Sequence, residues 1–183
     1  MKKVAILQSN YIPWKGYFDL IAAVDEFIIF DEMQYTKRDW RNRNLIKTPN
    51  GKEWLTVPVK TKNKFHQKIC ETEIDGREWK KKHLSSITQN YSNANFFQEI
   101  YQLIEPTYCQ NYHSFLSDLN LEFIQLVCSY LNIKTKISFS SDYSIIEDEK
   151  TDRLVSLCLA SKANVYFSGP SASRYIQEEK FKE

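Results

Sequence analysis

Glycine is scarce in this sequence, and its scarcity excludes one class of ligand site. The 183 residues include only four glycines. Neither of the two glycine-rich phosphate-binding patterns, GxGxxG and GxxxxGK[ST], occurs in the chain. A glycine-rich phosphate loop is therefore unavailable to this protein.

Metal-ligand spacing, signal-peptide features and long apolar runs are also missing. The four cysteines are widely spaced and form no CxxC or Cys/His pattern. Two of them, Cys128 and Cys158, lie in apolar helical patterns and are expected to be buried. The start, "MKKVAILQS", has too few apolar residues for a signal peptide, and no run approaches membrane-spanning length. We expect a cytoplasmic protein without a metal site, a disulfide framework or a membrane span.

The composition is that of a globular protein with an uneven distribution of charge. Hydrophobic residues make up 42% of the chain, charged residues 26% and aromatic residues 14%. The net charge is only +2, but the segment from Thr36 to Lys64 holds nine Lys or Arg against two acids, which is 9 − 2 = +7. This local positive charge suits a small anionic ligand that carries phosphate or carboxylate.

Hydrophobic periodicity predicts an α/β fold. Apolar runs at Val4 to Leu7 and Glu26 to Phe30 are typical of buried strands, and a helical pattern lies between them, over residues 14–24. This β-α-β unit implies a parallel sheet. Further strands are predicted at 53–59, 134–141 and 164–169, with 68–75 extending or pairing with the first of these, and helices at 77–91, 95–105, 113–133, 148–163 and 170–181. We expect one domain over residues 1–183, with a Rossmann-like, mainly parallel open sheet, flanking helices and a small strand insertion.

Polar residues follow three of the predicted strands, at the sheet edge where ligands bind in open α/β sheets. Each group also has a purely structural interpretation. In chain order, the first fastens the start of a helix, the second is a solvated charged face, and the third is a capped helix after a tight turn. The candidate ligand contacts are Gln8, Tyr11, Lys15 and Tyr17 after the first strand, Asp31, Gln34, Lys37, Arg38, Arg41, Asn42 and Arg43 after the second, and Ser168, Gly169, Ser171 and Ser173 after the last.

Few residues are candidates for proton transfer. Of the three histidines, His83 is the best placed general base or orienting group, because it lies on a predicted helix with Trp79 and Ile87 near one face. A single histidine on a helix is, however, more often structural than catalytic. Asp31 is the second candidate, since it follows directly from a predicted strand.

Residues 4–46 closely resemble the opening of the WbqC-like protein family. The similarity extends to "WLTVPV", to the helix around His83 and to "YFSGPSASRYI". The residues of the first block that carry it are Gln8, Tyr11, Pro13, Gly16, Tyr17, Phe18, Leu20, Ile21, Asp25, Asp31, Gln34, Tyr35, Lys37, Arg38, Asn42, Arg43 and Asn44. The resemblance implies a link with O-antigen and other surface polysaccharides, and placement of an amino acid, glycine, on an amino sugar. It also implies a C-terminal tail that this chain, ending at Glu183, lacks.

A weaker, fold-level resemblance is to the nucleotidyltransferase superfamily with HxGH motifs. "WKGY", from Trp14 to Tyr17, occupies the corresponding place and contains neither histidine. Lys15 or the arginines of the basic segment would have to replace them, so Lys15 joins His83 and Asp31 as a catalytic candidate. ATP stays an open question as a cosubstrate.

Three functional hypotheses follow. The first is a transferase or ligase that places an aminoacyl group on a nucleotide-linked amino sugar, with a nucleotide sugar or an activated carboxylate as its anionic partner. The second is a binding or scaffold module of polysaccharide synthesis without chemistry of its own, which would use Trp40 and Trp54 for partner contact. The third and weakest is single-stranded nucleic-acid binding, which the near-neutral net charge disfavours.

Overall fold

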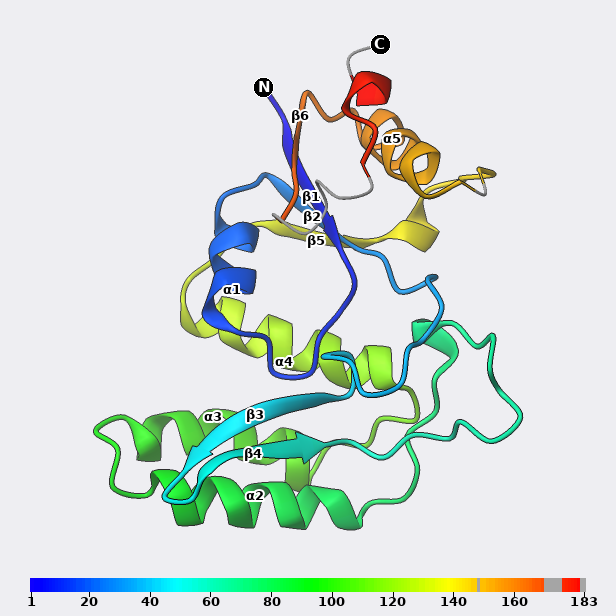
Figure 1. The fold of residues 1–183 in the computed structure, drawn as a ribbon. Helices are drawn as coiled ribbons and strands as arrows, with labels where there is room; N and C mark the ends of the chain where they lie inside the picture. Colours follow the sequence, from blue (N-terminus) through cyan, green and yellow to red (C-terminus); the bar gives the residue numbers. More distant parts are fainter. Residues whose placement is uncertain (148, 170–175, 182–183) are drawn as a thin grey trace. The chain divides into compact units, whose positions relative to one another are not determined.

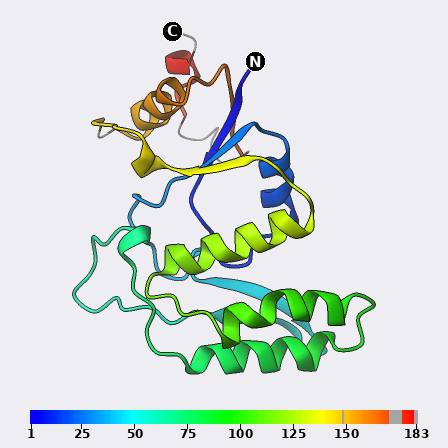
Figure 2. The same ribbon diagram turned by 180° about the vertical axis from the view of Figure 1, so that it is seen from behind.

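The computed structural model describes residues 1–147, 149–169 and 176–181, and its chain divides into two compact units. Unit 1 comprises Met1–Gln8, Trp14–Glu32 and Ile133–Glu183, and unit 2 comprises Ser9–Pro13 and Met33–Asn132. Figures 1 and 2 show the ribbon from opposite sides. The expectation of a single domain is not tested by this division and stays a prediction.

Unit 1 is built on a four-stranded parallel sheet in the order β5-β2-β1-β6. Its strands are β1 (Lys3–Leu7), β2 (Glu26–Ile29), β5 (Lys136–Phe139) and β6 (Val165–Phe167). The middle of β1 and the whole of β2 are buried, which explains their nearly continuous apolar runs. Helix α1 (Lys15–Ala22) joins β1 to β2, and α5 (Lys150–Ala160) precedes β6. The predicted parallel α/β sheet is confirmed.

The order of these strands contains one reversal. From β1 the chain adds β2 and then β5 on one side, and afterwards returns to place β6 on the other side of β1. The reversal therefore lies between β1 and β6. In open α/β sheets such a switch point leaves a crevice outside the carboxyl ends of the two strands.

Unit 2 combines an antiparallel hairpin with three helices. The hairpin consists of β3 (Arg43–Thr48) and β4 (Gly51–Thr56), and the helices are α2 (Glu78–Tyr91), α3 (Phe97–Cys109) and α4 (Leu116–Tyr130). Leu55 of β4 packs with side chains of all three helices, among them Trp79, Tyr108 and Phe123, in one buried cluster. Figure 1 shows the hairpin lying along α2.

Strand β3 was not predicted from the sequence. It begins at Arg43, inside the segment that we expected to be a loop, because its polar first residues, Arg43 and Asn44, hide the strand pattern. The turn signal before Gly51 was right, since Gly51 has φ +113°, a conformation that favours glycine. Residues 68–75 were expected to pair with the predicted strand at 53–59, and one isolated bridge, between Val59 and Ile74, joins the two segments.

The remaining differences concern element ends. Helix α3 continues through Pro106 to Cys109, beyond the predicted end at Glu105. Of the predicted helix at 170–181, residues 170–175 lie outside the described residues, and Glu178–Phe181 form a 3₁₀ turn. Cys128 and Cys158 are buried as predicted. Among the helices that the structure describes, none combines the length and apolar character needed to cross a bilayer.

Candidate functional site

The carboxyl edge of the sheet in unit 1 gathers three of the predicted polar groups. Gln8 directly follows β1, Asp31 follows β2, and Ser168 with Gly169 follows β6. Because β2, β1 and β6 are parallel neighbours, these residues leave the sheet at the same edge. Ser171 and Ser173 lie outside the described residues. Whether any of these side chains contacts a ligand stays a prediction.

The turn between Trp14 and Tyr17 fixes the start of α1 at this edge. Trp14 is the N-cap residue, and its side chain makes no capping hydrogen bond. A Cβ atom added to Gly16 would lie 2.1 Å from the Trp14 ring, so a larger residue there would displace the exposed indole. Tyr17 is buried, and its hydroxyl donates to the Gln8 carbonyl at 3.1 Å. Tyr17 therefore fastens the turn, while Lys15 in the first turn of the helix is exposed.

Several donors of the basic segment in unit 2 bind the protein's own backbone. Arg41 donates to the Ser9 carbonyl at 3.5 Å and to the side chain of Asn10. The amide group of Asn44 donates to the carbonyls of Tyr11 and Ile12. Asn42 is buried and donates to the Val57 carbonyl at 2.8 Å. Arg41 and Asn42, which were predicted to bind an anion, thus take part in holding unit 2 together.

A buried asparagine that we did not single out completes this network. Asn120 of α4 is fully buried, and its Nδ2 donates to Ser9 Oγ at 3.0 Å and to the Arg41 carbonyl at 2.9 Å. The available signal in the sequence was an asparagine in register with the apolar residues Leu116 and Phe123 of an amphipathic helix. A polar residue on a core-facing stripe needs a buried partner.

The other residues of the basic segment are more accessible. Lys37 and Arg38 are exposed, and so is Gln34, whose amide donates to the Phe65 carbonyl at 2.9 Å. The Arg43 guanidinium lies 3.9 Å from the centre of the Trp54 ring and donates to the Arg38 carbonyl. Among the predicted ligand contacts of this segment, Lys37, Arg38 and Arg43 are therefore the cations best placed to meet a ligand.

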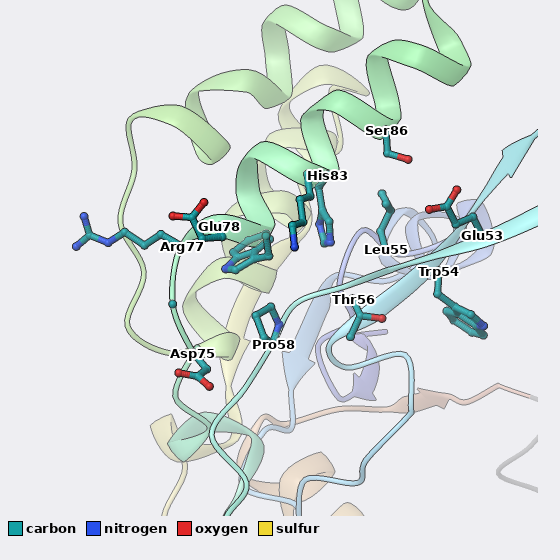
Figure 3. Close-up of a pocket in the computed structure, with 13 residues that line it drawn as sticks. Glu53, Trp54, Leu55, Thr56, Pro58, Asp75, Arg77, Glu78, His83 and Ser86 are labelled. Carbon is teal, nitrogen blue, oxygen red and sulfur yellow. The ribbon is translucent and has the colours of Figure 1, made fainter.

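His83 borders a pocket of about 610 Å³ in unit 2, between β4 and α2 (Figure 3). Its charged and hydroxyl-bearing lining residues are Glu53, Thr56, Asp75, Arg77, Glu78, Lys82 and Ser86. His83 itself is buried, and Nδ1 lies 2.8 Å from the Tyr11 hydroxyl, which also bonds to the Tyr108 hydroxyl. Tyr11, predicted as a ligand contact, is fully buried in the core of unit 2.

The surroundings of His83 favour its neutral form. Burial lowers its pKa to about 4, and a hydrogen bond with the backbone of Thr56 opposes this only in part. The ring thus bonds to the Tyr11 hydroxyl through Nδ1 and to the backbone of Thr56. These hydrogen-bond partners lie inside the protein. This geometry suits a structural histidine, and its role as a general base stays a prediction.

Comparisons with known proteins confirm the resemblance to the WbqC-like protein family. The family model described as "WbqC-like protein family" matches residues 8–183. The chain is 56% identical over all 183 residues to the uncharacterized protein Rv1507c of Mycobacterium tuberculosis, 79% of whose length the match covers. No solved structure matches the chain. The match to the family model over nearly the whole chain shows that this protein belongs to the WbqC-like protein family.

Proposed function

We propose that this chain is a transferase or ligase of surface-polysaccharide biosynthesis that places an aminoacyl group, such as glycyl, on a nucleotide-linked amino sugar. The observation that carries the proposal is the strand order β5-β2-β1-β6, with its reversal between β1 and β6. Doubly wound sheets bind nucleotides and related ligands outside the carboxyl ends of the strands at this point. Family membership supports the choice of pathway.

The residues at this edge suit a ligand that carries phosphate. Helix α1 directs its N-terminus, with the positive end of the helix dipole, toward the edge at which β1 ends, and its start lacks a side-chain cap. Lys15 adds an exposed positive charge in the first turn of α1. The β1-turn-α1 arrangement supports the analogy with the HxGH nucleotidyltransferases, in which Lys15 would supply charge in place of the absent histidines.

The proposed reaction forms one amide bond. The amine nitrogen of the sugar attacks the carbonyl carbon of the activated carboxylate, the C–N bond forms, and the leaving group departs with its bonding electrons. ATP, as cosubstrate, would supply the activation of the carboxylate. The proton of the attacking amine passes to a base, for which we propose Asp31, because it follows β2 at the same sheet edge.

The test combines binding with turnover. Titration calorimetry with ATP and with nucleotide-linked amino sugars should give binding that Lys15→Ala weakens about tenfold, the effect of losing one charge-assisted hydrogen bond. Lys134→Ala is the matched control, because Lys134 is an exposed lysine that precedes β5 at the opposite edge of the same sheet. Mass spectrometry of mixtures with ATP, glycine and the amino sugar should detect the amide. Binding that is unchanged in Lys15→Ala would contradict the proposed site.

A second candidate is a binding module without catalysis. The burial of His83 and its bond with the Tyr11 hydroxyl favour it, because they make the best placed histidine a poor candidate for proton transfer. Reproducible formation of the amide by the purified chain excludes this alternative. Tight binding of the nucleotide sugar without any product, across the range of amino acids tested, would support it.

A further inference from the structure

Two exposed tryptophans lie next to each other in unit 2. Trp40 and Trp54 are 47% and 40% exposed, and their ring centres are 5.3 Å apart at an angle of 50° between the planes. Isolated apolar residues on a surface are ordinary, but adjoining exposed indoles form a concentrated flat apolar surface. Such surfaces are favoured where another ring system stacks.

The register of the hairpin places positive charge on the same side as Trp54. Residues paired directly across an antiparallel hairpin share a face, and successive residues alternate between faces. One face therefore carries Arg43, Leu45 and Lys47 of β3 together with Lys52, Trp54 and Thr56 of β4. This face has three cations and no carboxylate. Figure 3 agrees, because Trp54 points to the opposite side of β4 from Leu55 and Glu53.

Arg43 links the aromatic surface to these charges. Its guanidinium stacks on Trp54 at 3.9 Å, which holds the indole in place and leaves a cation beside it. Its Nε is buried and has no hydrogen-bond partner among the described residues. The stacked guanidinium presents a planar fork of donors, the geometry that matches phosphate oxygens.

The loop that carries Trp40 is held in one conformation. The Asp39 carboxylate accepts hydrogen bonds from the Thr36 hydroxyl at 2.9 Å and the Trp40 amide at 2.7 Å. The Trp40 carbonyl accepts from the Tyr11 amide at 3.0 Å. Within this loop Arg38 has φ +61°, a strained conformation of the kind that is maintained at ligand clamps. Trp40 and the exposed Arg38 are therefore presented by a preorganised turn rather than by a free loop.

We propose that Trp40, Trp54 and Arg43 form a platform that binds a nucleoside diphosphate. The base stacks on the exposed indole surfaces, and the phosphates contact Arg43 and the neighbouring side chains of Arg38 and Lys37. A planar ring joined to an anion is the ligand class that uses both features of the platform. An acidic peptide would leave the indoles unused, and an uncharged sugar would leave the cations unused. The platform lies wholly within unit 2 and does not depend on the proposed acyl transfer.

The first measurement is titration of the whole chain with UDP and with ADP, followed by calorimetry and by quenching of tryptophan fluorescence. Trp40→Ala should weaken binding about tenfold, whereas Trp40→Phe, which keeps a stacking ring, should retain most of the affinity. Arg38→Ala should weaken binding of UDP but leave the weaker binding of uridine unchanged, because uridine has no phosphate. Circular dichroism verifies that each variant is folded.

Phe96→Ala is the matched control, because Phe96 is a 68% exposed aromatic residue of the same unit that belongs neither to the platform nor to the proposed sheet-edge site. It should leave UDP binding unchanged. If Trp14→Ala and Lys15→Ala abolish binding while Trp40→Ala does not, the platform proposal is overturned and the sheet edge of unit 1 is the nucleotide site. Affinity for oligothymidylate that rises with length and far exceeds that for UDP would also overturn it, in favour of single-stranded nucleic acid. Loss of UDP binding in Trp40→Ala with amide formation intact would uphold the platform as a separate site.

Discussion

Glu26 in unit 1 and His83 in unit 2 are both buried titratable groups with lowered pKa values, but for opposite reasons. Glu26, on β2, is fully buried, and burial by itself raises its pKa. Hydrogen bonds from Lys136, Lys2, Ser138 and Tyr143 outweigh burial and lower the pKa to about 2. Unit 1 therefore stabilises a charged carboxylate.

His83 shows the other outcome. No carboxylate of the described residues pairs with its ring, so burial dominates and lowers the pKa to about 4. The Tyr11 hydroxyl, 2.8 Å from Nδ1, is a partner with which the uncharged ring can form a hydrogen bond. Unit 2 thus stabilises a neutral base. The comparison teaches that a lowered pKa indicates a functional group only after its cause is known, because here one cause is an ion-pair network and the other is a hydrophobic core.

The largest predicted effect is the loss of stability of unit 2 in mild acid. Since the pKa of His83 is about 4 when folded and about 6.5 when unfolded, the unfolded chain binds the extra proton between these values. The stability due to this group is complete above pH 6.5 and falls by at most about 3 kcal/mol as the pH drops to 4. Urea unfolding followed by tryptophan fluorescence at several pH values measures this loss.

Two variants distinguish the titration of His83 from that of other groups in that experiment. His83→Gln should flatten the profile between pH 6.5 and 4, because glutamine does not titrate. His66→Gln, at an exposed histidine in the same unit, should leave the profile unchanged. A profile that stays equally steep in His83→Gln would show that burial of this ring does not control the acid sensitivity.

The second prediction concerns Glu26 and a lower pH range. Its contribution is complete above the unfolded value of about 4.5 and is lost as the pH falls toward 2, because the folded state binds the proton less well. Glu26→Gln should cost about 2 kcal/mol at pH 7, since it weakens charge-assisted bonds to Lys2 at 2.6 Å and Lys136 at 2.8 Å. Both lysines reach solvent, which limits the cost. Chemical unfolding at pH 7 measures it, and a stability equal to wild type would contradict the network.

The two units also differ in how well the sequence predicts them. The parallel sheet of unit 1 follows from short apolar runs, because strands buried on both faces carry a local signal. In unit 2, Tyr11 has a local context that suggests a ligand loop, yet it is buried by His83 and Tyr108, which are 72 and 97 residues away along the chain. Asn120 bonds to Ser9 across 111 residues. Such long-range partners have no local signature.

The difference between local signals and long-range partners also explains which candidate site residues lie where the sequence predicts them. Positions that depend only on strand direction, Gln8 and Ser168, lie at the expected edge. Arg41 was predicted from its chemistry as a ligand donor, but tertiary contacts with Ser9 and Asn10 occupy its guanidinium. Residue type and strand order are readable from sequence. The partners that satisfy a donor are not, because they depend on packing of distant elements.

The smallest predicted effect concerns a carboxylate whose pKa is strongly lowered but which contributes little to the stability of the fold. Glu73 has its pKa lowered to about 2 by hydrogen bonds from Lys60 and Lys64, the same value as Glu26. Its side chain is 34% exposed, however, and the side chains of Lys60 and Lys64 are 51% and 39% exposed. Water and salt screen such pairs, so Glu73→Gln should leave the melting temperature at pH 7 within experimental error of wild type.

Differential scanning calorimetry of Glu26→Gln and Glu73→Gln under identical conditions makes the comparison. Equal destabilisation by the two substitutions would show that burial does not distinguish them, whereas loss at Glu26 alone would assign the stabilising role to the buried network of unit 1.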